Sequence, residues 1–143
     1  MAVKQLSIFV ENRAGTLVEI TRAIADANID IRALSIADTT DYGILRLIVN
    51  DSEKAVKVMK DAGFTASVTE VIGVLIDDTP GGFSKAVETL SAAGINIEYA
   101  YAFISPTVGN AYVILRVEDN AAAENKLREA GIAVVTQEEI DKI

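Results

Sequence analysis

The amino-acid sequence predicts an α+β protein made of two similar units, each with the order strand, helix, strand, strand, helix, strand. The chain repeats itself at a spacing of 66 to 68 residues, which indicates two copies of one structural unit. Within each copy, segments in which apolar residues alternate are interrupted by segments in which they recur at helical spacing. With antiparallel sheets and both helices on one face, each copy would have the ferredoxin-like fold.

The repeat is clearest around the first helix of each copy. Residues 11–37 align with residues 77–103 without a gap, and the glycines and the apolar positions coincide. Two residues inserted near the segment ISPTVGN then lengthen the spacing from 66 to 68 for the rest of the chain. No linker rich in Pro, Ser or Gly separates the copies. We therefore expect two domains, at residues 1–72 and 73–143.

The first copy begins with alternating apolar residues and continues with a helical stripe. Leu6, Ile8 and Val10 lie at every second position, as in a half-buried strand. Apolar residues from Leu17 to Ala27 then recur at helical spacing. The expected elements are a strand at 5–10, a helix at 16–28, strands at 29–38 and 44–49, a helix that begins at 51 or 52 and stops near 63, and a strand at 66–72.

The second copy repeats this order. Phe83, Ala86 and Leu90 belong to the apolar stripe of its first helix. The expected elements are a strand at 74–77, a helix over the stripe from 83 to 93, strands at 97–104 and 111–117, a helix at 121–130 and a strand at 133–136. The remaining residues, 137–143, are rich in charge, and we interpret them as a solvated tail.

Composition and charge exclude several classes of function. The 143 residues hold 13 Lys and Arg against 21 Asp and Glu, a net charge of -8, with neither Cys nor His. This removes thiol and imidazole catalysis and the usual zinc ligands, and the acidity disfavours nucleic-acid phosphates. The apolar stretches are too short to cross a bilayer and the N-terminus lacks a signal-peptide pattern, so we expect a cytoplasmic protein. We expect no catalytic residues, no metal and no cofactor.

A short glycine-containing loop precedes the first helix of each copy, at residues 10–17 and 76–83. Such a junction places backbone N–H groups at a helix N-terminus, where unpaired donors and the helix dipole favour a carboxylate or another anion. At the far end of the same helix, Asp30 and Asn96 each lie between two isoleucines. Taken alone, these positions are explained better by helix capping and turn formation than by ligand binding.

The same segments resemble the opening of ACT domains, the small regulatory modules of amino-acid metabolism. The first copy reads ENRAG followed by LVEITRAIADANIDI, and the second reads DTPGGFSKAVETLSAAGINI. The second copy keeps the Pro-Gly pair of the ACT pattern, at Pro80 and Gly81, where the first has Ala14 and Gly15. The resemblance covers essentially the whole chain and implies an effector held between two modules that pack side by side.

The first copy is also similar to the serine-sensing ACT domain of phosphoglycerate dehydrogenases. In that family, an Asn of the loop and an Asn near the helix end bind the effector. The resemblance carries these roles to Asn12 and Asp30, with Asp78 and Asn96 as their counterparts in the second copy. The His of that family's loop is Val10 here, so the resemblance implies an amino-acid ligand but leaves serine itself in question.

The binding residues implied by the resemblance are the two loops, the helix starts and the two polar positions. They are Asn12, Arg13, Ala14, Gly15, Thr16, Leu17 and Asp30 in the first copy, and Asp78, Thr79, Pro80, Gly81, Gly82, Phe83 and Asn96 in the second. Backbone N–H groups would receive the carboxylate of a small amino acid, and Asn and Asp side chains would accept from its ammonium. We expect a homodimer without catalytic activity that acts through its oligomer geometry or on a separate metabolic enzyme.

Other functions fit the sequence less well. A structural or protein-interaction module with a vestigial ligand site is the main alternative. An enzyme related to acylphosphatases would need a phosphate-cradling loop with its Arg, and Arg13 gives no clear match. Aromatic residues on the expected strands would suit RNA stacking, but the basic surface is missing. A hard-ion site at Asp77, Asp78 and Glu98 has too few converging oxygens.

Overall fold

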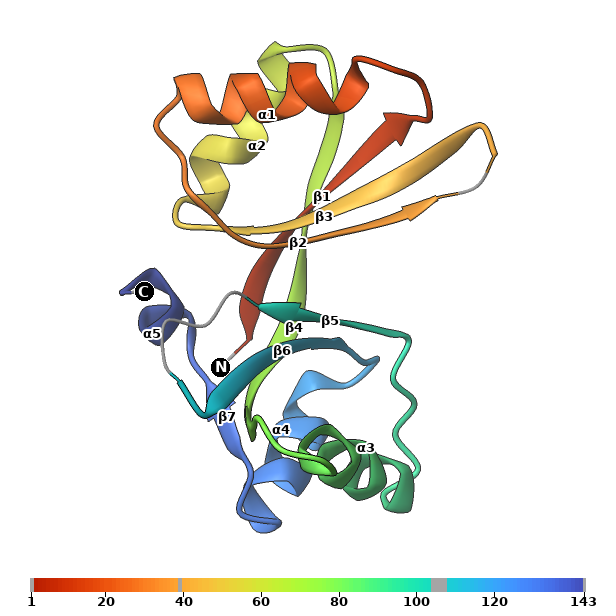
Figure 1. Ribbon diagram of the computed structural model, residues 1–143, viewed down its shortest axis with the longest axis vertical. Coiled ribbons are helices and arrows are strands. Elements are labelled where there is room, and N and C mark those ends of the chain that lie inside the picture. Colours follow the sequence, from red (N-terminus) through yellow and green to blue (C-terminus); the bar gives the residue numbers. More distant parts are fainter. Residues whose placement is uncertain (1, 39, 104–107, 143) are drawn as a thin grey trace. The chain divides into compact units, whose positions relative to one another are not determined.

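The computed structural model describes residues 2–38, 40–103 and 108–142 and shows an α+β protein (Figure 1). In chain order the elements are β1 (Val3–Glu11), α1 (Thr16–Asp26), β2 (Ile31–Asp38), β3 (Tyr42–Val49), α2 (Ser52–Asp61), β4 (Thr65–Asp77), α3 (Gly82–Ala92), β5 (Tyr99–Phe103), β6 (Asn110–Arg116), α4 (Asn120–Glu129), β7 (Ala133–Val135) and α5 (Gln137–Asp141). The predicted fold class, two βαββαβ units, is confirmed. No helix in the described part of the chain is long and apolar enough to cross a bilayer.

The chain divides into two compact units. The first consists of Lys4–Thr69, and the second of Glu70–Ile143 together with Met1–Val3. The change of unit falls within β4, so one continuous strand serves both units. The domain limits expected from the sequence, 1–72 and 73–143, stay a prediction.

Each unit has its own first and third strands at the centre of its sheet. In the first unit β3 lies between β1 and β2 and is antiparallel to both, with Leu47 opposite Leu6 of β1 and Leu34 of β2. The other edge of β1 pairs with β4. In the second unit β6 lies between β5 and β4, and β7 adds to β4, all antiparallel.

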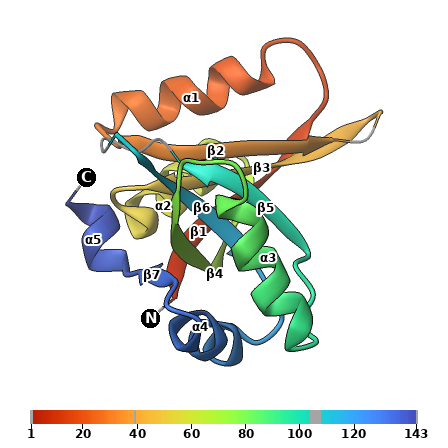
Figure 2. The ribbon, with the colours of Figure 1, turned by 60° about the horizontal axis from the view of Figure 1, so that its bottom comes forward.

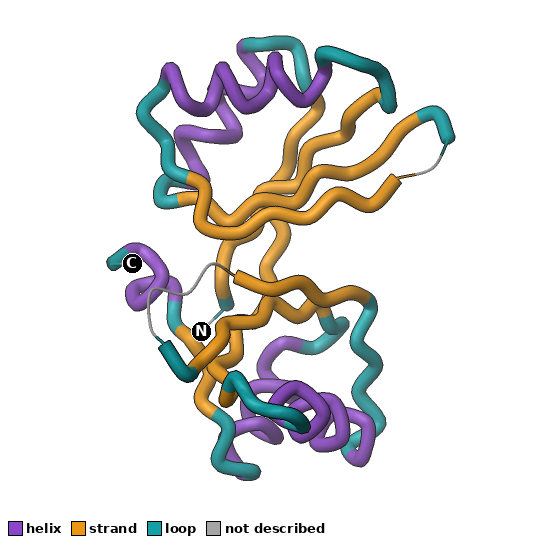
Figure 3. The backbone as a smooth tube through the Cα atoms, in the orientation of Figure 1, coloured by secondary structure: helices purple, strands orange, loops and turns teal. Residues whose placement is uncertain are grey.

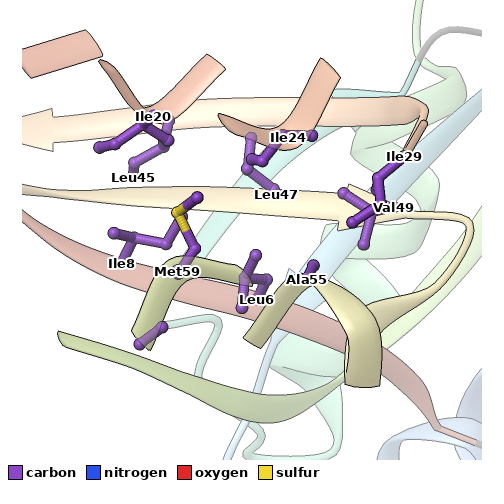
Figure 4. Packing of buried hydrophobic residues seen from close by; sticks show 11 residues of the cluster. Leu6, Ile8, Ile20, Ile24, Ile29, Leu45, Leu47, Val49, Ala55 and Met59 are labelled. Atoms are coloured by element: carbon purple, nitrogen blue, oxygen red, sulfur yellow. The ribbon is translucent and has the colours of Figure 1, made fainter. Parts of the chain in front are cut away.

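Two helices cover one side of each sheet. α1 packs against α2, and α3 packs against α4. Figure 3 shows that the two helices of each unit lie on the same side of its strands. In the first unit, Ile20 and Ile24 of α1 lie beside Leu45 and Leu47 of β3 (Figure 4). The same core cluster also contains Leu6, Ile8, Ile29, Val49, Ala55, Met59 and Ala66.

The second unit has an equivalent core. Ala86 and Leu90 of α3 take the places of Ile20 and Ile24, and both are fully buried. The cluster also contains Ile72, Val74, Val113, Leu115, Val117, Ala123, Leu127 and Ile132. In both units the first core residue of the helix lies one turn after its start, so burial of this residue fixes where the helix N-terminus lies relative to the sheet.

Helix α1 ends two residues earlier than the sequence predicts. It stops at Asp26, Ala27 is its C-cap residue, and Asn28 adopts a left-handed φ of 59°. Asn is among the few residues other than Gly that enter this conformation readily, which ends the helix. Strand β2 correspondingly begins at Ile31 rather than at residue 29. Residue 104, at the end of the expected strand 97–104, lies outside the described residues.

The charged C-terminal segment forms a helix, so the expected solvated tail is wrong. Helix α5 starts with a capping box, in which Thr136 Oγ1 accepts from Glu139 N at 3.2 Å and Glu139 Oε2 accepts from Thr136 N at 2.8 Å. Ile140 is 1% exposed. The reciprocal cap and the buried isoleucine outweigh the charge of the segment. Helix α5 directly follows β7 (Figure 2).

Candidate functional site

The N-terminus of α1 is open. Its N-cap residue is Gly15, which has no side chain to accept from the first backbone N–H groups. The intrahelical ladder starts where Glu19 N donates to Gly15 O at 3.0 Å. The N–H groups of Leu17 and Val18 precede this point and have no helical carbonyl within reach. Together with the positive end of the helix dipole, they form the kind of donor pair that binds anions.

An aspartate side chain caps the second helix of each unit. Asp51 at α2 and Asp119 at α4 each accept from the backbone N–H three residues later, at 3.1 Å. By contrast α3, like α1, begins at a glycine that provides no side-chain cap. Gly15 and Gly81 have φ values of 93° and 88°, which a residue with a Cβ rarely adopts. In both units the sequence therefore caps the second helix and leaves the first helix open.

The loop before each open helix is tied to the hairpin turn that follows the next strand. In the first unit, Asn12 N donates to Asp41 O at 2.9 Å and Asn12 Nδ2 donates to Thr40 O at 3.2 Å. In the second unit, Asp78 N donates to Gly109 O at 3.0 Å. The duplication thus preserves the backbone contact that fixes residue 12 or 78 just before the open helix.

A cavity of about 140 Å³ lies against this loop in the first unit. It is lined by Val10, Glu11, Asn12, Arg13, Thr16, Leu17, Ile36 and Gly43, so the loop, the helix start and all three strands β1, β2 and β3 contribute. Sites for drug-sized ligands enclose roughly 300 to 1,000 Å³. The smaller volume of this cavity suits a ligand with few heavy atoms.

The polar groups around the cavity include both signs of charge. Arg13 Nε lies 2.9 Å from Glu11 Oε2, and both side chains are more than half exposed. A surface pair of this kind contributes little to stability, which leaves both groups available for exchange with a ligand. The cavity therefore offers a cation and an anion next to an open helix N-terminus.

Thr16 is the polar residue of this cavity that the fold buries. The residue is 4% exposed, and its Oγ1 has no hydrogen-bond partner among the described residues. A buried hydroxyl without a partner costs about 1 to 3 kcal/mol of stability. A ligand that bonds to this hydroxyl would recover that free energy.

The loop of the second unit is built more tightly. A Cβ at Gly82 would lie 2.1 Å from Asp77 O, so glycine is required where the first unit has Thr16. The cavity that Gly82 lines has about 220 Å³ and also involves Lys85. The other expected residues of this loop, Asp78, Thr79, Pro80 and Gly81, precede α3, and Phe83 lies in its first turn with 40% of its surface exposed.

Comparison with known families decides what kind of module these loops belong to. The family described as ACT domain pair matches residues 1–143, the whole chain. The chain belongs to the ACT domain pair family. ACT domains are regulatory modules, and the match indicates no catalytic family.

Solved structures resemble this ACT domain pair along all or most of its length. A crystal structure of a protein from Bacteroides thetaiotaomicron is 38% identical, with a TM-score of 0.93, and the match covers 100% of this chain and 98% of that chain. Two others are regulatory subunits of aspartate kinase, each 17% identical. The Thermus thermophilus subunit, in ligand-free form, has a TM-score of 0.65, and the match covers 89% of this chain and 91% of that chain. The Thermus flavus subunit has a TM-score of 0.61, and the match covers 90% of this chain and 92% of that chain. These two show the common fold. No curated protein gives a significant match.

The two polar positions expected to complete the ACT site lie at the other end of the helix. Asp30 follows α1, whose eleven residues span about 16 Å. Asp30 N donates to Asn50 Oδ1 at 3.0 Å, and its carboxylate lies 2.9 Å from Arg32 Nη1. Asn96 has the equivalent place after α3 and lines a different cavity. Within one unit, the loop and the polar position therefore do not meet.

Four lining residues of the first-unit cavity were missed as site residues by sequence reasoning: Val10, Glu11, Ile36 and Gly43. Gly43 pairs with Val10 across β1 and β3, and a glycine within a strand is a signal of close approach that the sequence does contain. Ile36 gives no such signal, because only the order of the strands brings β2 to the loop. Of the expected residues, Asn12, Arg13, Thr16 and Leu17 are brought together at the cavity, with Ala14 and Gly15 between them in the chain.

Proposed function

We propose that this ACT domain pair is a non-catalytic regulatory sensor whose first unit binds a small amino acid at the N-terminus of α1. One observation carries the proposal: Thr16, the first residue of an uncapped helix, lines a small cavity with its hydroxyl buried and unpartnered. A helix N-terminus provides donors for a carboxylate, and the unpartnered hydroxyl provides a further polar group that the folded chain does not satisfy.

The carboxylate of the ligand would accept from the N–H groups of Leu17 and Val18. Arg13 lines the same cavity and would add a charge-assisted hydrogen bond, and the helix dipole favours the negative charge. Hydrogen bonds to charged groups contribute roughly 1.5 to 3 kcal/mol each, before the cost of association. Three of them are compatible with a Kd in the micromolar to millimolar range.

The ammonium of the ligand would meet oxygen acceptors of the loop itself. Asn12 is oriented by the hydrogen bond from its Nδ2 to Thr40 O, so its Oδ1 is the acceptor of a fixed amide group. The Glu11 carboxylate adds negative charge beside it. Val10 and Ile36 supply apolar walls, which favour a ligand with a small side chain.

The buried hydroxyl favours the first loop over the second. Thr16 gives the first cavity a buried hydroxyl without a partner among the described residues, whereas the equivalent position of the second unit is Gly82, which has no side chain. We therefore propose that the ligand binds at the first loop. We propose no ligand at the second loop, which consists of Asp78, Thr79, Pro80, Gly81, Gly82 and Phe83.

We further propose that a second copy of the chain closes the cavity. Asp30 and Asn96 lie a helix length away from the loops of their own units, so these side chains can contact the ligand only from another module. Leu17 and Ile36 at the cavity and the nearby strand residue Leu34 are 46%, 46% and 54% exposed. An apolar rim of this kind favours a homodimer with the ligand at its interface.

The regulatory effect would pass through this interface. A ligand that binds at a subunit contact changes the stability or geometry of the dimer, and a separate metabolic enzyme that recognises the dimer would respond. The alternative is a structural or protein-interaction module in which the cavity is vestigial. The alternative keeps the fold and the dimer but predicts no ligand.

A thermal-shift screen of the protein against the twenty amino acids tests the proposal. We expect the melting temperature to rise for one or a few small amino acids, because a ligand that binds only the folded state stabilises it. The α-carboxamide of each hit serves as the matched control, since it keeps the ammonium and the side chain but lacks the carboxylate. We expect the carboxamide to give no shift.

Two results would contradict the proposal. An unchanged melting temperature at millimolar concentrations of all twenty amino acids would favour the vestigial site. A shift that is equally large with the carboxamide would show that the helix N-terminus does not receive a carboxylate. Sedimentation with and without the hit then tests whether binding changes the oligomer.

A further inference from the structure

The core of the first unit is built in layers, in which residues of α1 lie against residues of β3. Ile20 of α1 lies beside Leu45, and Ile24 lies beside Leu47 (Figure 4). Residues four positions apart share one face of a helix. Thr16 therefore continues this row one turn earlier, at the start of α1, and it is buried like the two isoleucines.

The position of β3 in the same layer as Thr16 has no side chain. Every second residue of a strand faces the same side, so Gly43 precedes Leu45 and Leu47 on the side of β3 that faces the helices. Gly43 is buried and lies opposite Val10 of β1. Thr16, Gly43 and Val10 all line the cavity of about 140 Å³. The cavity is therefore the last layer of the core, which stays unfilled because β3 contributes no side chain to it.

The second unit fills the equivalent layer from the strand side. At the repeat spacings of 66 and 68 residues, Gly82 has the place of Thr16, and Ala111 has the place of Gly43. Ala111 lies opposite Ile76 in the pairing of β4 and β6. An extended strand backbone accepts residues with a Cβ, as Ala111 shows, so the conformation of β3 does not itself require glycine. A glycine inside a strand often marks a place where a ligand approaches closely.

The polar and the apolar groups of this cavity are on different elements. The buried hydroxyl of Thr16 and the open N–H groups of the first turn belong to the start of α1, where the carboxylate of the ligand would lie. The described residues on the strand side are Val10, Ile36 and Gly43, and none of their side chains has a hydrogen-bonding group. A carboxylate held at the helix start therefore leaves the strand side for the side chain of the ligand.

We propose that Gly43 determines the specificity of the amino-acid site, which takes an aliphatic side chain of about one to three carbon atoms. This inference rests on the proposed function, because it concerns the side chain of the same ligand. An apolar cavity of about 150 Å³ holds a molecule as large as benzene. The cavity at Gly43 has a similar volume. It therefore suits alanine, 2-aminobutyrate and valine, which have roughly six to eight non-hydrogen atoms.

Isothermal titration of the full chain with glycine, L-alanine, L-2-aminobutyrate, L-valine and L-leucine tests the size of the accepted side chain. We expect the affinity to rise by about threefold to fourfold for each added carbon atom up to valine, because each buried carbon contributes hydrophobic free energy. L-Leucine should bind about tenfold more weakly than L-valine, because its longer side chain would overpack the layer.

Two pairs of ligands of equal size test the apolar character of the strand side. L-Threonine differs from L-valine, and L-serine from L-2-aminobutyrate, by a hydroxyl in place of a methyl group. We expect each hydroxyl compound to bind about tenfold more weakly, because its hydroxyl would be buried without a partner. Equal or tighter binding of serine and threonine would overturn the inference, since their hydroxyl would then have found a polar partner in the cavity.

Gly43→Ala adds to the first unit the methyl group that the second unit has at this layer. We expect it to weaken binding of L-valine by about tenfold or more, while the affinity for L-alanine changes by less than about threefold. A merely structural role of Gly43 would weaken both ligands together. Because the added methyl group enters free space and restricts the unfolded chain, the melting temperature should not fall.

The matched control is Ala111→Gly, which removes the methyl group from the equivalent position of the second unit. It should leave both affinities unchanged within about twofold. The inference is wrong if Gly43→Ala leaves the ratio of the two affinities unchanged, if it lowers the melting temperature, or if L-leucine binds as tightly as L-valine. A chain that binds none of the twenty amino acids would instead contradict the proposed function, and the inference with it.

Discussion

Asn12→Ala is expected to weaken binding of the amino acid found by the screen by about tenfold or more. The substitution removes the oxygen that accepts from the ligand ammonium, and a hydrogen bond to a charged group is worth roughly 1.5 to 3 kcal/mol. It also removes the bond from Asn12 Nδ2 to Thr40 O, which orients the loop. Isothermal titration of the variant measures the affinity directly.

Two further variants separate a loss of binding from a loss of structure. Asp78→Ala changes the equivalent position of the second unit and should leave the affinity unchanged within about twofold. Thr16→Val removes the buried hydroxyl that has no partner, so we expect equal or higher stability but weaker binding. If Thr16→Val lowered the melting temperature and bound normally, the hydroxyl would have a structural role instead.

Gly82→Ala is expected to lower the free energy of unfolding by about 1 to 3 kcal/mol. The added Cβ would lie 2.1 Å from Asp77 O, a backbone atom that moves only if the loop itself moves. Chemical denaturation of the variant measures the change. We expect a lower midpoint with an unchanged slope, since the unfolded state is hardly altered.

The control for this substitution is Ser84→Ala, two residues further along the same helix at an exposed position. It should change stability by less than about 0.5 kcal/mol. An equal effect of the two substitutions would show that the loop tolerates a Cβ. Because Gly82 belongs to the second unit, we also expect amino-acid binding at α1 to persist in the folded fraction of Gly82→Ala.

Most of the fold could be predicted from the sequence because two independent copies give the same pattern. Periodicity located the strands and the four longer helices, and the repeat fixed their correspondence. The ends of elements were less predictable, as at Asn28, where a single left-handed residue ends α1. Helix α5 was missed because Glu138, Glu139, Asp141 and Lys142 obscured a capping box and one buried residue, Ile140.

The candidate site was only partly predictable, for a different reason. The loop and the helix start are contiguous in the chain, so sequence spacing was enough to bring Asn12, Arg13, Thr16 and Leu17 together. The contribution of Ile36 depends on strand order, which periodicity does not specify.

The most direct test of the central claim is a nuclear magnetic resonance titration of the backbone amides with the amino acid that raises the melting temperature. The claim is that the open N-terminus of α1 receives the ligand carboxylate. We expect the amide protons of Leu17 and Val18 to shift most strongly, because they gain a charged acceptor. The equivalent amides of α3, Phe83 and Ser84, should stay nearly unchanged. Large shifts at α3, with none at Leu17 and Val18, would contradict the claim.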